Sequence, residues 1–418
     1  MSGAAGHLMH LYDDTELTFG EIKDILTRAS KGQLEQVTEK LDGRNIVFTW
    51  NVKQNDLKVA RAAGDIKSGG MNATELAQKF QGRESLEEAF NSAFSVLRTS
   101  ISSLDNSQRL RVFGPAGNKW YSAEIIYAAS PNVVSYDSNS VVFHGFPVFN
   151  VDSTGNVEQI DDSSGITILS SNIEKMQNAL RGKDWTVHGP AIVSMKEMSD
   201  GSALSNAISA IDNLLSQNRI TDSETVQDFI EVALKKKLVE LGFSGSLLNS
   251  VHARILRKPG APDLRMLKKT APHSSDLLDR TIKGGDKMIT SILSPLDKII
   301  GAFAIKVLEG LKSSFIGDNK REVARLKQAT DEAISTINGS GDQGAIDFLN
   351  RQLERLGSTE NIKSAVEGVV FRYNGKTYKF TGAFAAANQI LGFYRYRQPA
   401  KTPIGESYLR NVIRLMLF

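Results

Sequence analysis

The sequence contains no cysteine among its 418 residues. This absence excludes disulfide bonds and zinc sites built from thiolates, and it makes a reducing cytoplasm the simplest location. The net charge is also small, at +3, so total charge alone indicates no nucleic-acid partner and any such argument depends on local clusters. The six histidines are scattered along the chain, and none has the spacing of a metal site.

Two further absences concern membranes and secretion. No apolar run approaches the length that spans a bilayer, so no membrane partner is expected. Residues 1–14 lack the basic and then apolar layout of a signal peptide. The remaining composition, 41% hydrophobic and 23% charged, is typical of a soluble globular protein with room for two or three domains.

The first stretch with chemical meaning is Lys40-Leu41-Asp42-Gly43, just ahead of a strand-like run at 45–52. A lysine that attacks a nucleotide must be neutral, and we expect partial burial and neighbouring cations to lower its pKa. The glycine lets the backbone approach a ligand closely. The alternative is an ordinary charged turn before a strand.

A second stretch lies more than three hundred residues later. Strand-like residues follow Glu367-Gly368, an Asn-Gly turn comes at 374–375, and a second strand holds Lys379 and Thr381. This pattern predicts a β-hairpin. Period-two alternation places Lys379 and Thr381 on one face, opposite Tyr378 and Phe380. A plain surface hairpin is the alternative interpretation.

Two more stretches lie between these: 120–126, which contains Glu124, and 141–146, which contains Phe143. Taken together, the four stretches resemble the covalent nucleotidyltransferase superfamily of ATP-dependent DNA and RNA ligases and mRNA capping enzymes. The resemblance covers residues 1–170 and 360–418, and the final segment also resembles phage proteins with a ligase-like core. It implies an α+β fold built on antiparallel sheets.

The resemblance also implies roles for individual residues. Lys40 would be the nucleophile that takes AMP from ATP, and Lys379 would neutralise the α-phosphate. Asp42 and Glu367 would hold Mg²⁺ or Mn²⁺ together with the nucleotide. Either Arg61 or Lys67 would supply a basic contact to nucleotide or nucleic acid. The other nucleotide contacts would come from Glu39, Gly43, Asn45 and Glu124, and from Phe143 stacked on the purine.

The sequence departs from the family pattern at three points, one of which is a helical insert where ordinary ligases have a much shorter connection. The other two concern the late motif and the end of the chain. The late motif usually holds two lysines at alternating positions, and Thr381 stands at the second; Lys376 is the nearest substitute, although a regular strand puts it on the other face. The chain ends at Phe418, which leaves no room for the oligonucleotide-binding barrel of DNA ligases and capping enzymes. The last departure favours RNA ends as the substrate, or nicks in a duplex that another protein presents.

We expect three domain segments. Residues 1–171 would form the first part of the core, with a helix over 16–42, strands at 45–52 and 57–62, helices within 72–104 and strands within 108–150. Residues 172–358 would form an inserted helical domain, because apolar residues recur at helical spacing in 203–218, 223–242, 286–315, 319–338 and 342–356. Residues 359–418 would complete the core.

The insert contains a basic cluster, which suits phosphate-backbone binding but equally suits a solvated helix face. Its members are Arg254, Arg257, Lys258, Arg265, Lys268 and Lys269. The tail at 394–397 alternates tyrosine and arginine, which is compatible with nucleic-acid contact or with the end of a strand.

These observations predict an ATP-dependent polynucleotide ligase, joining RNA rather than DNA. It would act through a lysyl-AMP on Lys40 and seal a 5′-phosphate to a 3′-hydroxyl, in the host cytoplasm if phage-encoded. Two alternatives are a phage structural protein with an inactive ligase-like core and a nucleotidyltransferase that uses a non-nucleic-acid acceptor.

Overall fold

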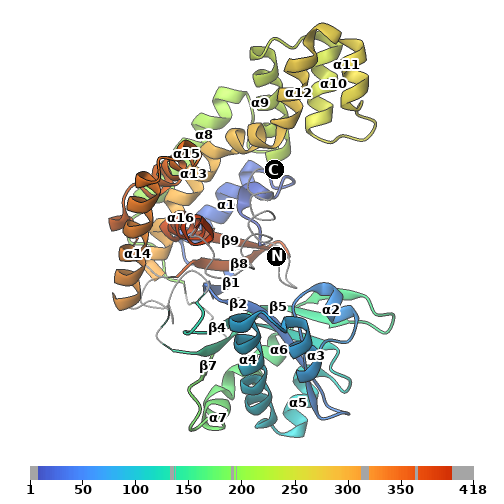
Figure 1. Cartoon of the computed structure of the whole chain (residues 1–418), viewed down its shortest axis with the longest axis vertical. Coiled ribbons are helices and arrows are strands. Elements are labelled where there is room, and N and C mark those ends of the chain that lie inside the picture. Colours follow the sequence, from blue (N-terminus) through green and yellow to red (C-terminus); the bar gives the residue numbers. More distant parts are fainter. Residues whose placement is uncertain are drawn as a thin grey trace. The chain divides into compact units, whose positions relative to one another are not determined.

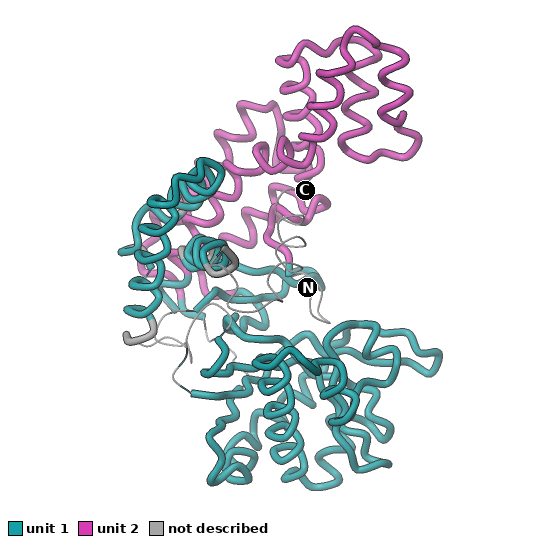
Figure 2. Tube along the Cα trace, viewed as in Figure 1, with its two compact units in different colours: residues 1–8, 34–196, 308–395 teal, residues 9–33, 197–307, 396–418 magenta. Residues whose placement is uncertain are grey.

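A computed structural model describes residues 8–131, 136, 138–189, 193, 195–311, 320–362 and 366–397 (Figure 1). The fold is α+β with mainly antiparallel sheets, which confirms the expected class. The chain divides into two compact units (Figure 2). Unit 1 comprises residues 1–8, 34–196 and 308–395, and unit 2 comprises 9–33, 197–307 and 396–418. These units cut the chain at other residues than the predicted domains, which therefore remain a prediction.

The larger sheet of unit 1 is six-stranded, with strand order β3-β2-β4-β5-β6 and β7 added in parallel to β5. The strands are β2 Arg44–Asn51, β3 Asp56–Ala60, β4 Lys119–Ile126, β5 Ser140–Val151, β6 Val157–Ile160 and β7 Thr186–His188. Strands β2 and β3 were predicted, and their hairpin is confirmed. The predicted strand segment at 131–136 falls mostly on residues outside the described part.

The smaller sheet of unit 1 has the order β1-β8-β9, with β1 Glu35–Lys40, β8 Gly368–Tyr373 and β9 Lys376–Thr381. The β8–β9 hairpin is confirmed, and its turn residues Asn374 and Gly375 both have positive φ, as a tight hairpin turn with Asn-Gly requires. Strand β1 pairs antiparallel with β8, so this sheet joins residues from opposite ends of the sequence.

One face of the six-stranded sheet is covered by helices of the same unit, and Figure 1 shows several of them beside the sheet. The core between them is apolar and includes Phe48, Phe90 and Phe113. These helices are α3 Ala73–Phe80, α4 Glu84–Ser102, α5 Asn106–Phe113, α6 Ser163–Ser171 and α7 Ile173–Asn178. The other described α-helices of unit 1 are α2 Ala63–Lys67, α14 Lys320–Gly339, α15 Gln343–Leu356 and α16 Ala383–Arg397. The opposite face of the sheet carries a smaller apolar cluster, formed by Val47, Ala60, Ile66, Trp120 and Phe149.

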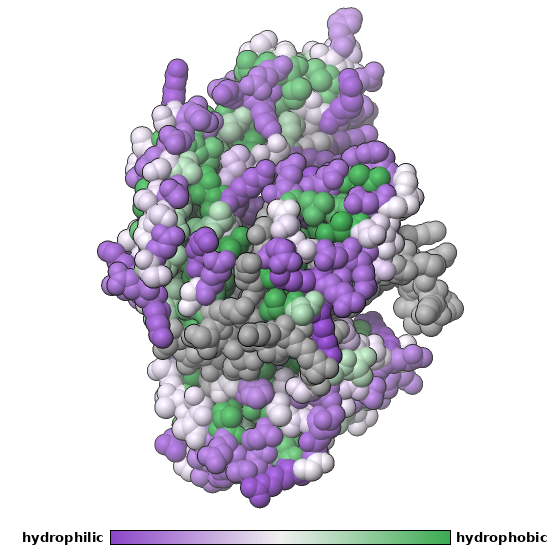
Figure 3. All heavy atoms as spheres, turned by 90° about the vertical axis from the view of Figure 1, so that its left-hand side faces the viewer, coloured by the Kyte–Doolittle hydropathy of each residue, from purple (hydrophilic) through white to green (hydrophobic). Residues whose placement is uncertain are grey.

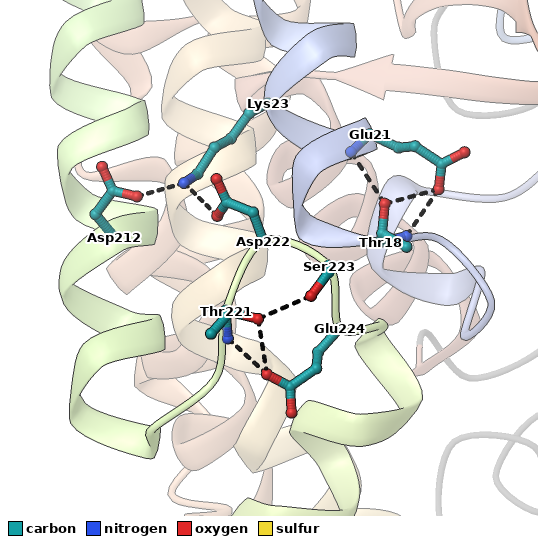
Figure 4. A network of polar contacts seen from close by, with 8 residues as sticks. All are labelled: Thr18, Glu21, Lys23, Asp212, Thr221, Asp222, Ser223 and Glu224. Carbon is teal, nitrogen blue, oxygen red and sulfur yellow. Dashed lines mark hydrogen bonds and ion pairs between the residues drawn. The ribbon is translucent and has the colours of Figure 1, made fainter.

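Unit 2 is helical in the part that the structure describes. Its α-helices are α1 Phe19–Ser30, α8 Ser202–Asn218, α9 Val226–Glu240, α10 Gly245–Ile255, α11 Leu264–Thr270, α12 Ser275–Lys283 and most of α13 Gly285–Leu311. Figure 4 shows Lys23 of α1 bonded to Asp212 of α8 and to Asp222 of the loop before α9. Thr18 and Glu21 cap α1 reciprocally. The predicted helices 203–218 and 223–242 are confirmed, as are those at 319–338 and 342–356 in unit 1.

Three predicted elements differ from the structure. The helix expected over 16–42 ends at Ser30, and residues 35–40 form β1. Gln36 has a positive φ at an irregularity in this strand, which breaks the period-two pattern that would have identified it. Strand character expected at 109–113 is helix α5, which Asp105 caps. Residues 394–397 continue α16 and do not end a strand.

Helix α13 corrects the expectation that no segment is long enough to span a bilayer. By length and composition, Gly285–Leu311 is the one helix in the described residues that would suffice. Asp297 and Lys298 interrupt its apolar run, but a spanning segment tolerates a few charges. Such a helix also occurs in the cores of other proteins. On the face drawn in Figure 3, apolar side chains form groups between hydrophilic ones.

Candidate active site around Lys40

Lys40 lies at the end of β1, opposite Gly368 at the start of β8. The backbone N–H of Glu367 donates to the carbonyl oxygen of Lys40 at 3.1 Å. This pairing brings the Glu367 carboxylate to the Lys40 side chain, and Nζ donates to Oε2 in a short ion pair. Both side chains are mostly buried. Two predicted site residues that are 327 positions apart are therefore in direct contact.

The loop from β1 to β2 packs tightly against β4. A Cβ at Gly43 would lie 2.6 Å from Cγ of Glu124 and 2.7 Å from the carbonyl oxygen of Ile125. Distances this short are clashes, so only glycine lets the loop pass here. The next residue back, Asp42, is buried. Gly43 is thus required by the close approach of two protein segments, whereas the sequence suggested close approach to a ligand.

Tyr136 is a member of this site that the sequence did not reveal. Its hydroxyl accepts a hydrogen bond from the backbone N–H of Asp42 at 3.3 Å. The ring packs on Leu41, Ile126 and Val142. Burial raises its pKa well above the ordinary value, and the charge of Asp42 adds to the effect. No motif marks this residue in the sequence, because its place depends on tertiary packing.

Glu124 and Asn45 lie opposite each other on β4 and β2. The Asn45 side-chain amide donates to Oγ of Ser122 at 2.7 Å, and its Oδ1 is buried with no partner among the described residues. Oε2 of Glu124 lies 3.2 Å from Nε2 of His144. The predicted neighbours Glu124 and Asn45 are thus brought together, with His144 beside them.

The structure separates the two basic residues that the sequence left as alternatives. The Arg61 guanidinium donates to the backbone oxygen of Asn45 and lies 4.9 Å from the ring centre of Phe90. Burial lowers its pKa, and the Glu124 carboxylate partly offsets this effect. Lys67 is exposed at the end of α2. Arg61 is therefore the basic residue next to Asn45 and Glu124.

Lys379 lies on the same face of the small sheet as Lys40. In the β1-β8-β9 register, Lys40 is opposite Gly368 and Gly368 is opposite Thr381, while Val370 is opposite Lys379. Directly opposed residues share a face, so Lys40, Lys379 and Thr381 all project to one side. Lys379 is 8% exposed. Lys376 is exposed and alternates to the other side, as the sequence predicted.

Carboxylates, and not cations, dominate the surroundings of Lys40. Burial lowers the pKa of Lys40, but the charge and hydrogen bond of Glu367 and the charges of Glu124 and Asp42 together outweigh burial, so the pKa is raised. The expectation of a lowered pKa is wrong for this state. The physical reason is that the acidic motif residues Glu367, Glu124 and Asp42 all act on Nζ.

Two predicted residues point away from the site. Phe143 is opposite Ala123, so it lies on the other face of the sheet from Glu124, and its ring packs in the core 5.2 Å from Phe48. Stacking on a purine is not compatible with this position. Glu39 is opposite Val369, on the face of the small sheet that Lys40 does not share. It is buried there and contributes negative charge near Tyr136.

No group of three or more histidine or acidic residues in the described part of the chain is arranged to hold a metal ion. Asp42 and Glu367 both act electrostatically on Lys40 and on Tyr136, so both carboxylates lie near the Lys40 and Tyr136 side chains. Magnesium commonly takes one or two protein carboxylates and completes its shell with phosphate and water. The predicted pair, Asp42 and Glu367, is compatible with magnesium binding of this kind.

The basic cluster of unit 2 is partly neutralised. Arg257 pairs with Asp286 at 3.1 Å, Lys258 with Glu231 at 2.8 Å and Lys268 with Asp279 at 2.6 Å. The acids come from α13, α9 and α12, so the sequence around the cluster did not reveal them. The remaining members, Arg254, Arg265 and Lys269, are exposed. This arrangement weakens the electrostatic case for a nucleic-acid groove.

The chain was also compared with known proteins. No family model, curated protein or solved structure matches it.

Proposed function

We propose that the protein transfers a nucleotide onto Lys40 and acts as an ATP-dependent polynucleotide ligase. The observation that supports this most is the contact between Lys40 and Glu367 across 327 positions. These are the residues to which the resemblance assigns the nucleophile and its acidic partner. The resemblance names two further site residues, and both fit this arrangement. Lys379 lies on the same face as Lys40, and the charge of Glu124 acts on Lys40.

The chemistry follows from the groups present. Nζ of Lys40 first loses one proton to water and then, as the neutral amine, attacks the α-phosphorus of ATP; a nitrogen–phosphorus bond forms, and the bond to the bridging oxygen breaks as pyrophosphate leaves. Oε2 of Glu367 is within hydrogen-bond reach and is the group placed to take the second proton, which the nitrogen loses once it is bonded to phosphorus. Lys379 would offset the negative charge that develops on the phosphate oxygens.

Asp42 and Glu367 would hold a divalent cation, Mg²⁺ or Mn²⁺. Several buried or half-buried carboxylates surround a single lysine, so this part of the chain carries an excess of negative charge that fits such an ion. When bound, the ion supplies positive charge that compensates carboxylates and phosphates. Such compensation would favour the neutral amine of Lys40, because Glu367 is the main group that raises its pKa.

The nucleotide on Lys40 is then passed to an acceptor. A polynucleotide 5′-phosphate, RNA in preference to DNA, follows from the resemblance. The neutralised cations of unit 2 favour a second candidate, in which the acceptor is not a nucleic acid. In both cases the first half-reaction on Lys40 is the same.

The test is to incubate the full chain with Mg²⁺ and α-labelled ATP and to measure label on the denatured protein. A phosphoramidate is stable in alkali and labile in acid. We expect such label on the wild type and none on Lys40→Arg, which keeps the positive charge beside Glu367. Lys53→Ala, at an exposed turn residue, is the control and should label normally. Absence of label with ATP, GTP and Mn²⁺ would overturn the proposal in favour of a structural role.

A further inference from the structure

The face that Lys40 and Lys379 share contains a third cation, which no motif indicates. In the β8–β9 register Arg372 is opposite Thr377, and Val370 is opposite Lys379. Arg372 therefore projects to the same side as Lys379 and is its diagonal neighbour, at a separation that long side chains can bridge. Thr381 occupies the position where the late motif would place a second lysine, and Lys376 is exposed on the other side.

The present contacts of Arg372 are weak for a guanidinium. Nη1 lies 3.4 Å from Oε1 of Gln36 and 3.4 Å from Oδ2 of Asp161. Hydrogen bonds between a charged donor and a carboxylate are normally shorter, at about 2.7–2.9 Å. The Asp161 side chain is 56% exposed, so water competes for it. A better anionic partner can displace Asp161.

Two polar atoms beside this pair lack partners. Nε of Arg372 and Oγ1 of Thr377 are both buried and have no hydrogen-bond partner among the described residues. Nε–H can only donate, and the threonine hydroxyl can also donate. Their positions are directly opposite in the strand register. A group with several acceptor oxygens on one centre would satisfy both donors.

We propose that Arg372, Thr377 and Lys379 form a phosphate-binding subsite, in which a phosphate group replaces Asp161 as the partner of Arg372. A phosphate accepts in the plane of the guanidinium and carries the charge that Arg372 and Lys379 complement. The inference rests on the proposed function, where the phosphate belongs either to the triphosphate of ATP or to the 5′-end of a polynucleotide. Arg372 thereby adds a cation further along the strand than Thr381, beside Thr377.

The subsite is tested by titrating inorganic pyrophosphate into the full chain in a calorimeter, without turnover. Arg372→Gln should weaken binding about tenfold, the loss expected for one charge-assisted contact. Asp161→Asn should tighten binding, because it removes the competing carboxylate. Lys376→Gln removes a positive charge from the same hairpin on the opposite face, and should leave binding within about twofold. Wild-type affinity in Arg372→Gln, or weaker binding in Asp161→Asn, would overturn the proposal.

Two variants distinguish a loss of phosphate binding from a loss of folding. A gain of affinity in Asp161→Asn cannot arise from unfolding, and Arg372→Lys keeps the charge while losing Nε, so its affinity should fall between wild type and Arg372→Gln. If Lys40 takes no label, the proposed function fails, whereas the pyrophosphate titration still tests the subsite.

Two further titrations identify the source of the phosphate. A loss of preference for ATP over AMP in Arg372→Gln assigns the subsite to the triphosphate. A loss of preference for 5′-phosphorylated over 5′-hydroxyl oligoribonucleotide assigns it to the acceptor. If Arg372→Gln changes neither preference, the proposal is refuted.

Discussion

Replacing Glu367 with glutamine should lower the pKa of Lys40 from its wild-type value. In the wild type, burial lowers this pKa, and Glu367 is the largest of the effects that raise it. An opposite charge at this range shifts a pKa by about 1–3 units, and each unit corresponds to about 1.4 kcal/mol. Glu124 and Asp42 remain in the variant, so we expect the pKa to fall from its wild-type value while part of the rise is kept.

The measurement is the rate of acetylation of Lys40 against pH, followed by peptide mass spectrometry. The midpoint gives the pKa, since only the neutral amine reacts. Glu35→Gln is the matched control, because Glu35 is exposed at the other end of β1, roughly 15 Å away at the usual rise of a strand. A midpoint in Glu367→Gln equal to that of the wild type would show that the ion pair does not control Lys40.

The same shift determines how stability depends on pH. A lysine whose folded-state pKa is raised stabilises the fold fully below its unfolded-state pKa, near 10.5, and this contribution is lost as pH rises through the folded-state value. The wild type should therefore lose stability above pH 10.5. In Glu367→Gln the folded-state pKa is lower than in the wild type, so the variant should lose less stability above pH 10.5. Urea unfolding of both proteins across this range measures the difference.

Three further predictions concern packing and polar networks. Gly43→Ala should destabilise unit 1 by about 1–3 kcal/mol, because its Cβ would clash with Glu124 and Ile125, whereas Gly64→Ala meets open space and should be nearly neutral in urea unfolding. Tyr121→Phe should cost about 1.5–3 kcal/mol by removing a buried 2.6 Å bond to Asp162. Burial raises the pKa of Asp162, but the hydrogen bonds from Lys119 and Tyr121 outweigh burial, so the pKa is lowered. The stabilisation from the Tyr121–Asp162 bond should therefore be lost as the pH falls below about 4 and Asp162 takes up a proton. Lys23→Met should destabilise unit 2 by no more than about 1 kcal/mol, because Asp212 and Asp222 are more than half exposed, and high salt should reduce the difference in thermal midpoint.

Local signals in the sequence were sufficient for some elements. The Asn-Gly turn at 374–375 predicts the β8–β9 hairpin because few other residues adopt positive φ at both turn positions. Asn72 with Glu75 predicts the start of α3 because the two side chains cap the helix reciprocally. The helices at 203–218 and 342–356 follow from apolar spacing alone. Each of these depends on residues that are close in the sequence.

Other elements depend on distant partners, which the sequence does not specify. Leu34, Val37 and Leu41 have helical spacing, but their segment contains β1, whose partner β8 lies more than three hundred residues away. The sequence also did not specify to which side of the sheet Phe143 of β5 projects, because a shift of one residue in a strand exchanges its two faces. His144 is the aromatic residue on the face of Glu124. The sequence alone therefore could not decide whether Phe143 or His144 lies on the face of Glu124.

The pairing of β1 with β8 explains how a site assembles from both ends of the chain. The N–H of Glu367 bonds to the carbonyl oxygen of Lys40, so the separation of their side chains is set by backbone hydrogen bonds and not by the long intervening segment. The length of that segment therefore has little effect on this local geometry. The same pairing also places the Glu367 carboxylate where it holds Lys40 protonated. If Lys40 is the nucleophile proposed above, its amine has to be neutral, and a divalent cation held by Asp42 and Glu367 would supply the charge that compensates this carboxylate.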